Sequence, residues 1–284
     1  MKKLNVLVAG STGYIGVQLV KLLCKHKFVK IRYLCGNSSI GRKIEVYDES
    51  LKKYKLPKII KIKYKYFKEV DVIFTALPNG QSQIIANNLN DRNVLIDLSA
   101  DFRIKKFDIY EKFYKIKHKS KNLLKKSIYG LSELNENKIK EKQIIACPGC
   151  YPTSVILGAF PAFNMGLVRD SELIADCKSG VSGAGRTPSA VTHFPETADG
   201  LHAYKTLTHR HAPEMSHYLG GPTVRFIPHL VPTIRGILST LYLRLKPDIA
   251  LADVRHVYES AYAAETFISV LQDGQHPDPR HVRG

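Results

Sequence analysis

The sequence predicts an α/β fold in two parts, a parallel sheet covered by helices and then a more β-rich α+β part. Two observations carry this prediction. Over residues 1–148, short runs rich in Val, Ile and Leu alternate with helical patterns, as is typical of buried parallel strands. After residue 149, β-rich stretches are separated by turns. The chain of 284 residues is long enough for two domains, which we expect at 1–148 and 149–284.

The first elements are a strand at residues 4–9, a helix at 17–25 and a second strand at 29–35, with a glycine-rich turn after the first strand. The turn consists of Gly10, Ser11, Thr12, Gly13, Tyr14, Ile15 and Gly16. Its glycines permit a tight turn close to a phosphate, and the last lets the helix pack on the strand while the helix N-terminus faces a pyrophosphate. This order predicts a Rossmann-type dinucleotide-binding domain.

The residues after the second strand indicate which dinucleotide binds. An acidic residue at this place would hold a ribose 2′-hydroxyl, and none is present. Ser38 and Ser39 stand there instead, followed by Arg42 and Lys43. Because hydroxyls and cations suit a 2′-phosphate, we expect NADP(H) rather than NAD.

The remaining elements of the first part follow the same alternation. Strands are expected at 71–77 and 94–99, with a helix at 81–89 between them. The spacing of basic and aromatic residues over 104–126 is compatible with surface helices. A last strand-like run occupies 143–146.

A single thiol stands at the junction of the two parts. Pro148 and Gly149 break the preceding strand, and Pro152 opens an apolar segment that predicts a helix. Cys150 then lies at a helix N-terminus, where unpaired N–H groups and the helix dipole favour the thiolate. The pattern therefore indicates a nucleophile, and a buried structural cysteine is the alternative.

In the second part we expect strands at 173–178, 223–228 and 234–244 and a helix at 254–264. Nine of the 11 histidines lie here. His209 and His211 flank Arg210 in a polar turn, and Pro213 with Glu214 predicts a helix start beside them. A general acid/base close to the thiol is the functional interpretation.

A small-residue loop at 179–186, SGVSGAGR, ends in the cation Arg186 and suits an anionic substrate group. A flexible turn is the alternative for this loop. Cys147 and Cys150 form a CxxC pair, but no second pair accompanies it, so no metal site is expected.

Composition excludes several classes of function. The longest apolar runs are too short for a transmembrane helix, and the glycine turn interrupts the N-terminal apolar run where a signal peptide would continue. Five scattered cysteines argue against a disulfide framework. We therefore expect a cytoplasmic protein without membrane partners.

The net charge of +18 is confined to the first part. Residues 1–146 carry 27 Lys and 4 Arg against 13 acidic residues, whereas residues 147–284 carry 3 Lys and 9 Arg against 12 and are neutral. Interleaved Lys and Tyr at 52–55 and 61–66 allow a nucleic-acid surface, but lysines on solvated faces are the preferred explanation. The abrupt change leaves open whether the two halves share one source.

Taken together, these motifs closely resemble the N-acetyl-gamma-glutamyl-phosphate reductase family. The resemblance is carried by eight segments in the family's order: GSTGYIG (10–16), ALPNGQS (76–82), IDLSADFR (96–103), YGLSELN (129–135), PGCYPT (148–153), SGVSGAGR (179–186), HRHAPEM (209–215) and PHLVPTIRGILST (228–240). It covers nearly the whole chain. Cys147 stands where the family more usually has Asn.

The resemblance implies a semialdehyde dehydrogenase fold, with an α+β catalytic and dimerisation domain after the Rossmann domain. It implies NADPH-dependent reduction of N-acetyl-L-glutamyl 5-phosphate to the 5-semialdehyde and phosphate, through a Cys150 thioester, in arginine biosynthesis. The acid/base is then His211 or His209, with His211 preferred. Cofactor contacts extend from the glycine turn to Ser38, Ser39, Pro78, Ser182 and Gly183, and substrate contacts are implied for Arg103, Ser182, Arg186 and Glu214.

The resemblance also implies a homo-oligomer, either a dimer or a tetramer. Family members continue past the position of Gly284, so a chain truncated at its C-terminus is expected, and its activity and stability are left open. The alternatives are a sister reductase of aminoadipyl or aspartyl phosphate, an inactive fragment whose basic half binds polyanions, and a chimera that does not fold stably.

Overall fold

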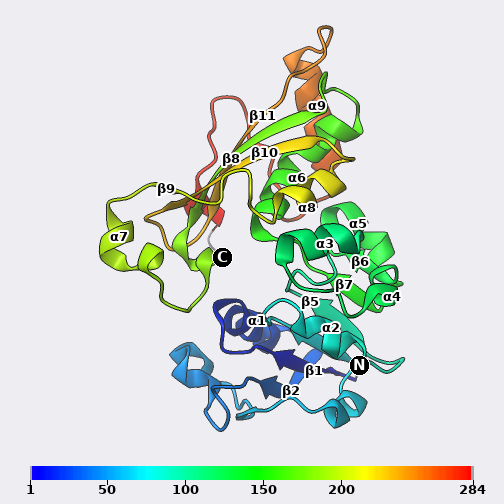
Figure 1. Cartoon of the computed structure of the whole chain (residues 1–284), viewed down its shortest axis with the longest axis vertical. Coiled ribbons are helices and arrows are strands. Elements are labelled where there is room, and N and C mark those ends of the chain that lie inside the picture. The colour runs from blue at the N-terminus through cyan, green and yellow to red at the C-terminus, as the bar shows by residue number, and fades with distance from the viewer. Residues whose placement is uncertain (1, 283–284) are drawn as a thin grey trace. The chain divides into compact units, whose positions relative to one another are not determined.

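The structure is a computed structural model that describes residues 2–282. The chain divides into two compact units, Met1–Pro148 (unit 1) and Gly149–Gly284 (unit 2). Each is described by itself below (Figure 1). None of the helices within residues 2–282 is long and apolar enough to cross a membrane.

Seven strands in the described part of unit 1 form one parallel sheet in the order β3-β2-β1-β4-β5-β7-β6. The strands are β1 (Leu4–Ala9), β2 (Val29–Cys35), β3 (Ile59–Ile60), β4 (Val72–Thr75), β5 (Val94–Asp97), β6 (Ser127–Tyr129) and β7 (Ile144–Ala146). The order reverses between β1 and β4, and such a switch point is where parallel sheets of this kind bind nucleotides. The predicted Rossmann-type domain is confirmed.

Helices connect these strands (Figure 1). They are α1 (Tyr14–Lys25), α2 (Gln81–Ala86), α3 (Phe107–Tyr114), α4 (Lys121–Leu124) and α5 (Ser132–Ile139). The sequence placed the start of α1 at residue 17, but the helix begins at Tyr14, inside the glycine turn. Tyr14 and Ile15 are exposed, so the apolar periodicity does not register the first turn.

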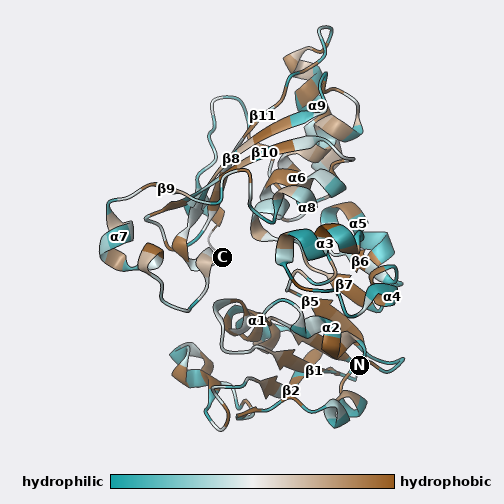
Figure 2. Ribbon diagram, viewed as in Figure 1, coloured by the Kyte–Doolittle hydropathy of each residue, from teal (hydrophilic) through white to brown (hydrophobic). Residues whose placement is uncertain are grey.

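The core of unit 1 lies on both faces of the sheet because successive strand residues point to opposite sides. Val6 and Val8 of β1 pack with α1 residues on one face, and Leu7 and Ala9 pack on the other with Ile85 of α2. Figure 2 shows the central strands as largely hydrophobic. Helices on both faces explain why these strands read as continuous apolar runs.

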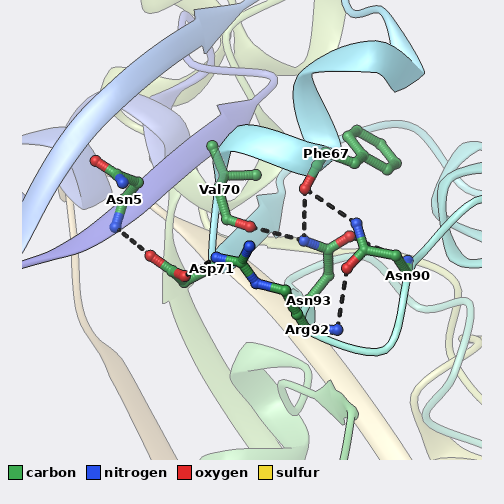
Figure 3. Close-up of polar contacts among 7 residues, drawn as sticks. All are labelled: Asn5, Phe67, Val70, Asp71, Asn90, Arg92 and Asn93. Atoms are coloured by element: carbon green, nitrogen blue, oxygen red, sulfur yellow. Dashed lines mark hydrogen bonds and ion pairs between the residues drawn. The ribbon is translucent and has the colours of Figure 1, made fainter.

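A network of polar contacts fixes the loop before β5 (Figure 3). The fully buried Asn93 side chain donates to the carbonyl oxygens of Phe67 at 2.9 Å and Val70 at 2.8 Å. Asp71, just before β4, accepts from the N–H of Asn5 at 2.8 Å. These bonds tie β1, β4 and β5 together at the amino ends of the strands.

The segment 104–126 contains the helices α3 and α4 at the surface, as the sequence predicted, and each buries part of its side chains. Helix α3 is amphipathic, and its Tyr110 is fully buried. The rings of Tyr110 and Tyr114 stack at 4.7 Å, and the Tyr110 hydroxyl donates to Asp101 at 2.6 Å. Tyr110 and Tyr114 therefore mark the buried face of α3, whereas Lys106 and Lys112 are exposed.

Unit 2 contains a mixed sheet of four strands within its described residues, in the order β11-β8-β10-β9. Strands β8 and β10 are parallel, and β9 and β11 are antiparallel to their neighbours. The elements are α6 (Cys150–Asn164), β8 (Glu172–Gly180), α7 (Phe194–Ala198), β9 (His202–Ala203), α8 (Ala212–Tyr218), β10 (Thr223–Val231), β11 (Ile237–Tyr242) and α9 (Leu251–Tyr262). This is the predicted α+β fold.

Helices α6 and α8 cover one face of this sheet, and α9 packs against α6 (Figure 1). Leu173, Ala175 and Cys177 of β8 are buried on that face. The alternate residues Ile174, Asp176 and Lys178 belong to the other face, which is more accessible. The helical face carries the start of α6, where the predicted nucleophile lies.

Candidate functional site

The glycine turn of unit 1 requires its glycines for space as well as conformation. Gly10 has a φ of +81°, and a Cβ there would lie 2.2 Å from the Ala76 oxygen. A Cβ on Gly16 would lie 2.1 Å from the Gly10 oxygen. Gly13 is the N-cap of α1 and meets no atom closer than 3.9 Å, and the first turn of α1 has no acidic residue. The turn thus fits a phosphate at the helix N-terminus.

The hydroxyls predicted to bind the cofactor are used in different ways. Ser11 is fully buried and donates to the Cys35 oxygen at 3.2 Å. Ser39 is buried, accepts from the Tyr47 hydroxyl at 2.7 Å and lies 3.5 Å from the Thr12 hydroxyl. Ser38 and Pro78 are exposed. Of the two serines after β2, Ser38 is the one whose side chain faces solvent.

Arg103 lies after β5 in unit 1 and is only 7% exposed. Its guanidinium donates to the Cys147 oxygen at 2.7 Å and to the Leu98 oxygen at 3.1 Å. The side chain thereby fixes the backbone immediately before the nucleophile turn, in addition to the substrate role that the resemblance implies.

A neighbouring carboxylate, Asp101, was missed by the sequence reasoning. It is fully buried and accepts from the N–H groups of Gly80 at 2.7 Å and Gln83 at 3.3 Å, which begin α2. Its backbone oxygen lies 2.8 Å from His118 Nε2. An acidic residue facing a distant helix start leaves no local pattern in the sequence.

Cys150 is the first residue of α6, with Gly149 as N-cap, and its side chain is exposed. The helix begins two residues before Pro152. Burial raises the pKa of Cys35 to about 12 and those of Cys147 and Cys177 to about 11. These three thiols stay protonated and inert at neutral pH. Cys150 is the exposed one of the five thiols.

His209 and His211 are both buried, at 7% and 8% exposure, with ring centroids 4.7 Å apart. The N–H of His211 donates to Nδ1 of His209 at 3.1 Å, so this nitrogen is unprotonated. Burial, reinforced by the charges of Arg210 and Lys205, lowers the pKa of His209 from 6.5 to about 4. His209 is therefore neutral at physiological pH.

Two tyrosines surround this histidine pair. The Tyr151 ring lies edge-on to His209 at 5.8 Å and to His211 at 6.0 Å, and Tyr204 lies 5.6 Å from His209. The Tyr204 hydroxyl donates to that of Tyr151 at 3.1 Å. Burial raises the pKa of both tyrosines. Tyr151 follows Cys150 directly, which was a signal the sequence reasoning did not use, whereas Tyr204 gave none.

Glu214 connects the segment 209–211, which carries the two histidines, to the turn 148–150, which carries Cys150. It is fully buried on α8, and its Oε1 accepts from the Gly149 N–H at 2.9 Å. Helix α8 begins after His211, with Pro213 in its first turn, as the sequence predicted. Unit 2 thus brings Cys150, the two histidines and Glu214 to the paired starts of α6 and α8.

The loop after β8 holds the other predicted site residues of unit 2. Ser182 and Gly183 lie in a short 3-10 turn, Val181–Ala184, and the Ser182 N–H donates to the Ile234 oxygen at 3.1 Å. Arg186 is exposed. The loop is thus held through its backbone, and its cation faces solvent.

A cavity elsewhere in unit 2 is lined by none of the residues that the sequence predicted for the site. A cavity of about 190 Å³ is lined by Ala190, Val191, Glu196, Thr197, Gly200, His202 and Leu230. Among residues 2–282, no cluster of three or more His, Cys, Asp or Glu side chains is arranged to hold a metal ion.

Two family models match the two units. The semialdehyde dehydrogenase NAD binding domain matches residues 5–142, and the semialdehyde dehydrogenase dimerisation domain matches residues 150–284. Fold and site together define an oxidoreductase of the semialdehyde dehydrogenase class.

Curated relatives narrow this class. An N-acetyl-gamma-glutamyl-phosphate reductase of Desulforamulus reducens is 42% identical over 99% of this chain and 83% of its own length. A probable chloroplastic N-acetyl-gamma-glutamyl-phosphate reductase of Arabidopsis thaliana is 35% identical over 100% of this chain and 72% of its own. The chain belongs to the N-acetyl-gamma-glutamyl-phosphate reductase family, which confirms the resemblance.

Solved structures share the fold at low identity. Aspartate semialdehyde dehydrogenase II of Vibrio cholerae aligns with a TM-score of 0.70 at 15% identity, over 100% of this chain and 85% of its own. The enzyme of Candida albicans, solved with NADP, gives a TM-score of 0.65 at 18% identity, over 98% and 85%. These likenesses support the two-part α/β fold.

Proposed function

We propose that this chain reduces N-acetyl-L-glutamyl 5-phosphate to N-acetyl-L-glutamate 5-semialdehyde with NADPH, as a cytoplasmic step of arginine biosynthesis. The observation that carries the proposal is an exposed thiol at the first residue of α6, tied through Glu214 to the His211 segment, in a chain of this family. The cytoplasmic location is supported by five free cysteines.

The residues present fit a dinucleotide, since the glycine turn lies at the switch point of the sheet with room beside Gly13. We assign the pyrophosphate to the turn 10–16 and the 2′-phosphate to Ser38, Arg42 and Lys43, which are exposed after β2. The resemblance adds Pro78, Ser182 and Gly183 as further contacts. When bound, NADPH supplies the hydride that reduces the acyl carbon.

Cys150 performs the covalent step. Its thiolate attacks the acyl carbon, and the bond between that carbon and the phosphate oxygen breaks, so that phosphate leaves with the electron pair. The product is a thioester on Cys150. The position at a helix N-terminus supports this role because backbone N–H groups and the helix dipole stabilise the thiolate.

His211 is assigned as the acid/base. His209 is held neutral, and its Nδ1 is engaged by the His211 N–H, so His209 is poorly suited to donate a proton at neutral pH. His211 protonates the oxygen when the thioester is reduced to a thiohemiacetal. It takes the proton back as the carbon–sulfur bond breaks, which releases the aldehyde and regenerates the thiolate.

Anionic groups of the substrate are assigned to Arg103, Arg186 and Ser182, following the resemblance. Arg186 is exposed, and the Arg103 guanidinium holds two backbone oxygens. A homo-oligomer is part of the proposal because unit 2 matches a dimerisation domain.

The test is substitution of the nucleophile in the full chain. Cys150→Ala should lower phosphate-dependent reduction of NADP by N-acetyl-glutamate semialdehyde at least about 10³-fold. NADPH binding, followed by nucleotide fluorescence, should persist. Cys24→Ala, which removes a half-buried thiol of α1, is the matched control and should leave the rate unchanged.

A near-normal rate in Cys150→Ala would refute the thioester mechanism. The sister reductases are separated by substrate, because aminoadipyl and aspartyl phosphates assayed beside the acetylglutamyl compound should give lower kcat/KM.

A further inference from the structure

The starts of helices α6 and α8 are joined by one buried carboxylate. Glu214 is the third residue of α8, is fully buried, and accepts the Gly149 N–H at 2.9 Å through Oε1. Gly149 is the N-cap of α6 and precedes Cys150. The bond therefore ends one residue from the thiol.

The partner of Glu214 is unusual for its place in a helix. A glutamate at the third helical position commonly reaches back to the N–H of its own N-cap residue. In α8 that cap is His211, whose N–H donates to His209 Nδ1 at 3.1 Å. Because His209 serves this amide, Glu214 Oε1 is directed to the cap of the neighbouring helix.

Because Glu214 bonds the N-cap residue of α6 while His209 bonds the N-cap residue of α8, the segments that carry Cys150 and His211 are linked. The burial of His209 keeps its ring neutral and able to accept the His211 N–H. Glu214 then sets the position of α8, which starts after His211, against the turn that carries Cys150. Loss of the carboxylate would leave the buried Gly149 N–H without this partner and free the turn to shift.

We propose that Glu214 is a positioning residue that holds Cys150 and His211 in register through the Gly149 amide. The proposal rests on the proposed function for the roles of Cys150 and His211. It adds a role for Glu214 that needs no contact with substrate. A misplacement of about 1 Å costs on the order of 10²-fold in rate, which sets the expected effect.

The experiment compares Glu214→Ala with Glu214→Gln in the full chain, with Glu259→Ala as control for an exposed helical carboxylate. Glutamine keeps an oxygen that accepts the Gly149 N–H. Glu214→Ala should lower kcat by roughly 10- to 100-fold with KM for the acyl phosphate within about threefold, and Glu214→Gln should recover most of that loss. Alkylation of Cys150 by iodoacetamide at fixed pH should change in Glu214→Ala and stay close to wild type in Glu214→Gln.

Three results would overturn the proposal. A rise in KM without loss of kcat, equal in both variants, would make Glu214 a substrate ligand. Unchanged kcat and an unchanged rate of Cys150 alkylation in Glu214→Ala would show that Glu214 does not position Cys150. If Glu214→Ala does not unfold cooperatively, the proposal is tested with Glu214→Gln alone. In that variant, a rate of Cys150 alkylation far from the wild-type rate would contradict positioning through the Gly149 amide. Alkylation needs no substrate, so failure here is distinct from failure of the Cys150 mechanism.

Discussion

Cys150 and His209 occupy opposite environments within one site. The thiol is exposed at a helix start, whereas the imidazole is enclosed by Tyr151, Tyr204 and Phe226. Water solvates the charge of an exposed group, while burial penalises a charged form. This contrast explains why the pKa of the His209 ring lies well below its ordinary value.

The burial of His209 gives the folded protein a pH dependence. The unfolded chain protonates this ring near pH 6.5, whereas the folded chain does so near pH 4. The stability that this group contributes is full above pH 6.5 and declines as the pH falls towards 4, by about 2 kcal/mol after allowance for solvent screening. As the pH falls from 6.5 to 4, the free energy of unfolding of His209→Asn should therefore decrease less steeply than that of wild type. Denaturant unfolding at several pH values measures both.

Asparagine keeps an oxygen that can accept the His211 N–H but does not titrate. The comparison therefore separates the effect of protonating His209 from the loss of its hydrogen bond. His256→Asn, on the exposed side of α9, is the control and should run parallel to wild type. Equal slopes for His209→Asn and wild type would show that His209 is not held neutral by burial.

Elements with strong local signals were found where the sequence placed them. Strand β2 matches its prediction at both ends, and β4, β5, β8, β10 and β11 differ only in their ends. Helix α6 starts at Cys150, before Pro152, because a proline in the first turn gives up only an N–H that has no partner within the helix. Strand β6 and helix α5 were missed because one is three residues long and the other buries no side chain.

The loop before β5 is held by an asparagine rather than by apolar contacts. Asn93→Ala would leave the buried carbonyls of Phe67 and Val70 without these donors, and should lower the free energy of unfolding by about 2–3 kcal/mol. Asn88→Ala, which removes an exposed bond to the Ile84 oxygen, should cost about 0.5 kcal/mol or less. Urea unfolding measures both.

A similar loss for Asn88→Ala and Asn93→Ala would mean that burial of the Asn93 bonds contributes little. An unchanged urea midpoint in Asn93→Ala would show that the Asn93 hydrogen bonds do not stabilise this fold.

The basic and aromatic clusters of unit 1 also depend on packing. Tyr54 and Tyr66 pack against the two cores of the sheet, and Lys53 and Lys65 lie over their rings at 5.4 and 5.8 Å. Rings used in this way are not open to stack on bases. The arrangement favours lysines on solvated faces, the explanation preferred from the sequence.

The accessible face of the unit 2 sheet is where we expect a second copy of the chain. Ile174 and Tyr242 are paired across β8 and β11 and are 37% and 57% exposed. Because unit 2 matches a dimerisation domain, an aspartate at either position should dissociate the oligomer. Sedimentation velocity should show wild type above 31.9 kDa and both variants at that mass.

Leu251→Asp, at an 80% exposed position of α9, is the control and should keep the wild-type mass. A wild-type monomer at all concentrations, or intact oligomers in Ile174→Asp and Tyr242→Asp, would contradict this assignment of the interface.

Local sequence determined the glycine turn and the thiol at the start of α6, because each depends on neighbouring residues that set backbone conformation. The order of eight motifs along the chain indicated the family. Tertiary structure alone decided that Glu214 holds the Gly149 amide, 65 residues away, and that Tyr204 and Phe226 enclose His209. These contacts arise from packing of α6 and α8 on one sheet face. Burial, which has no local pattern, then lowers the pKa of His209 to about 4.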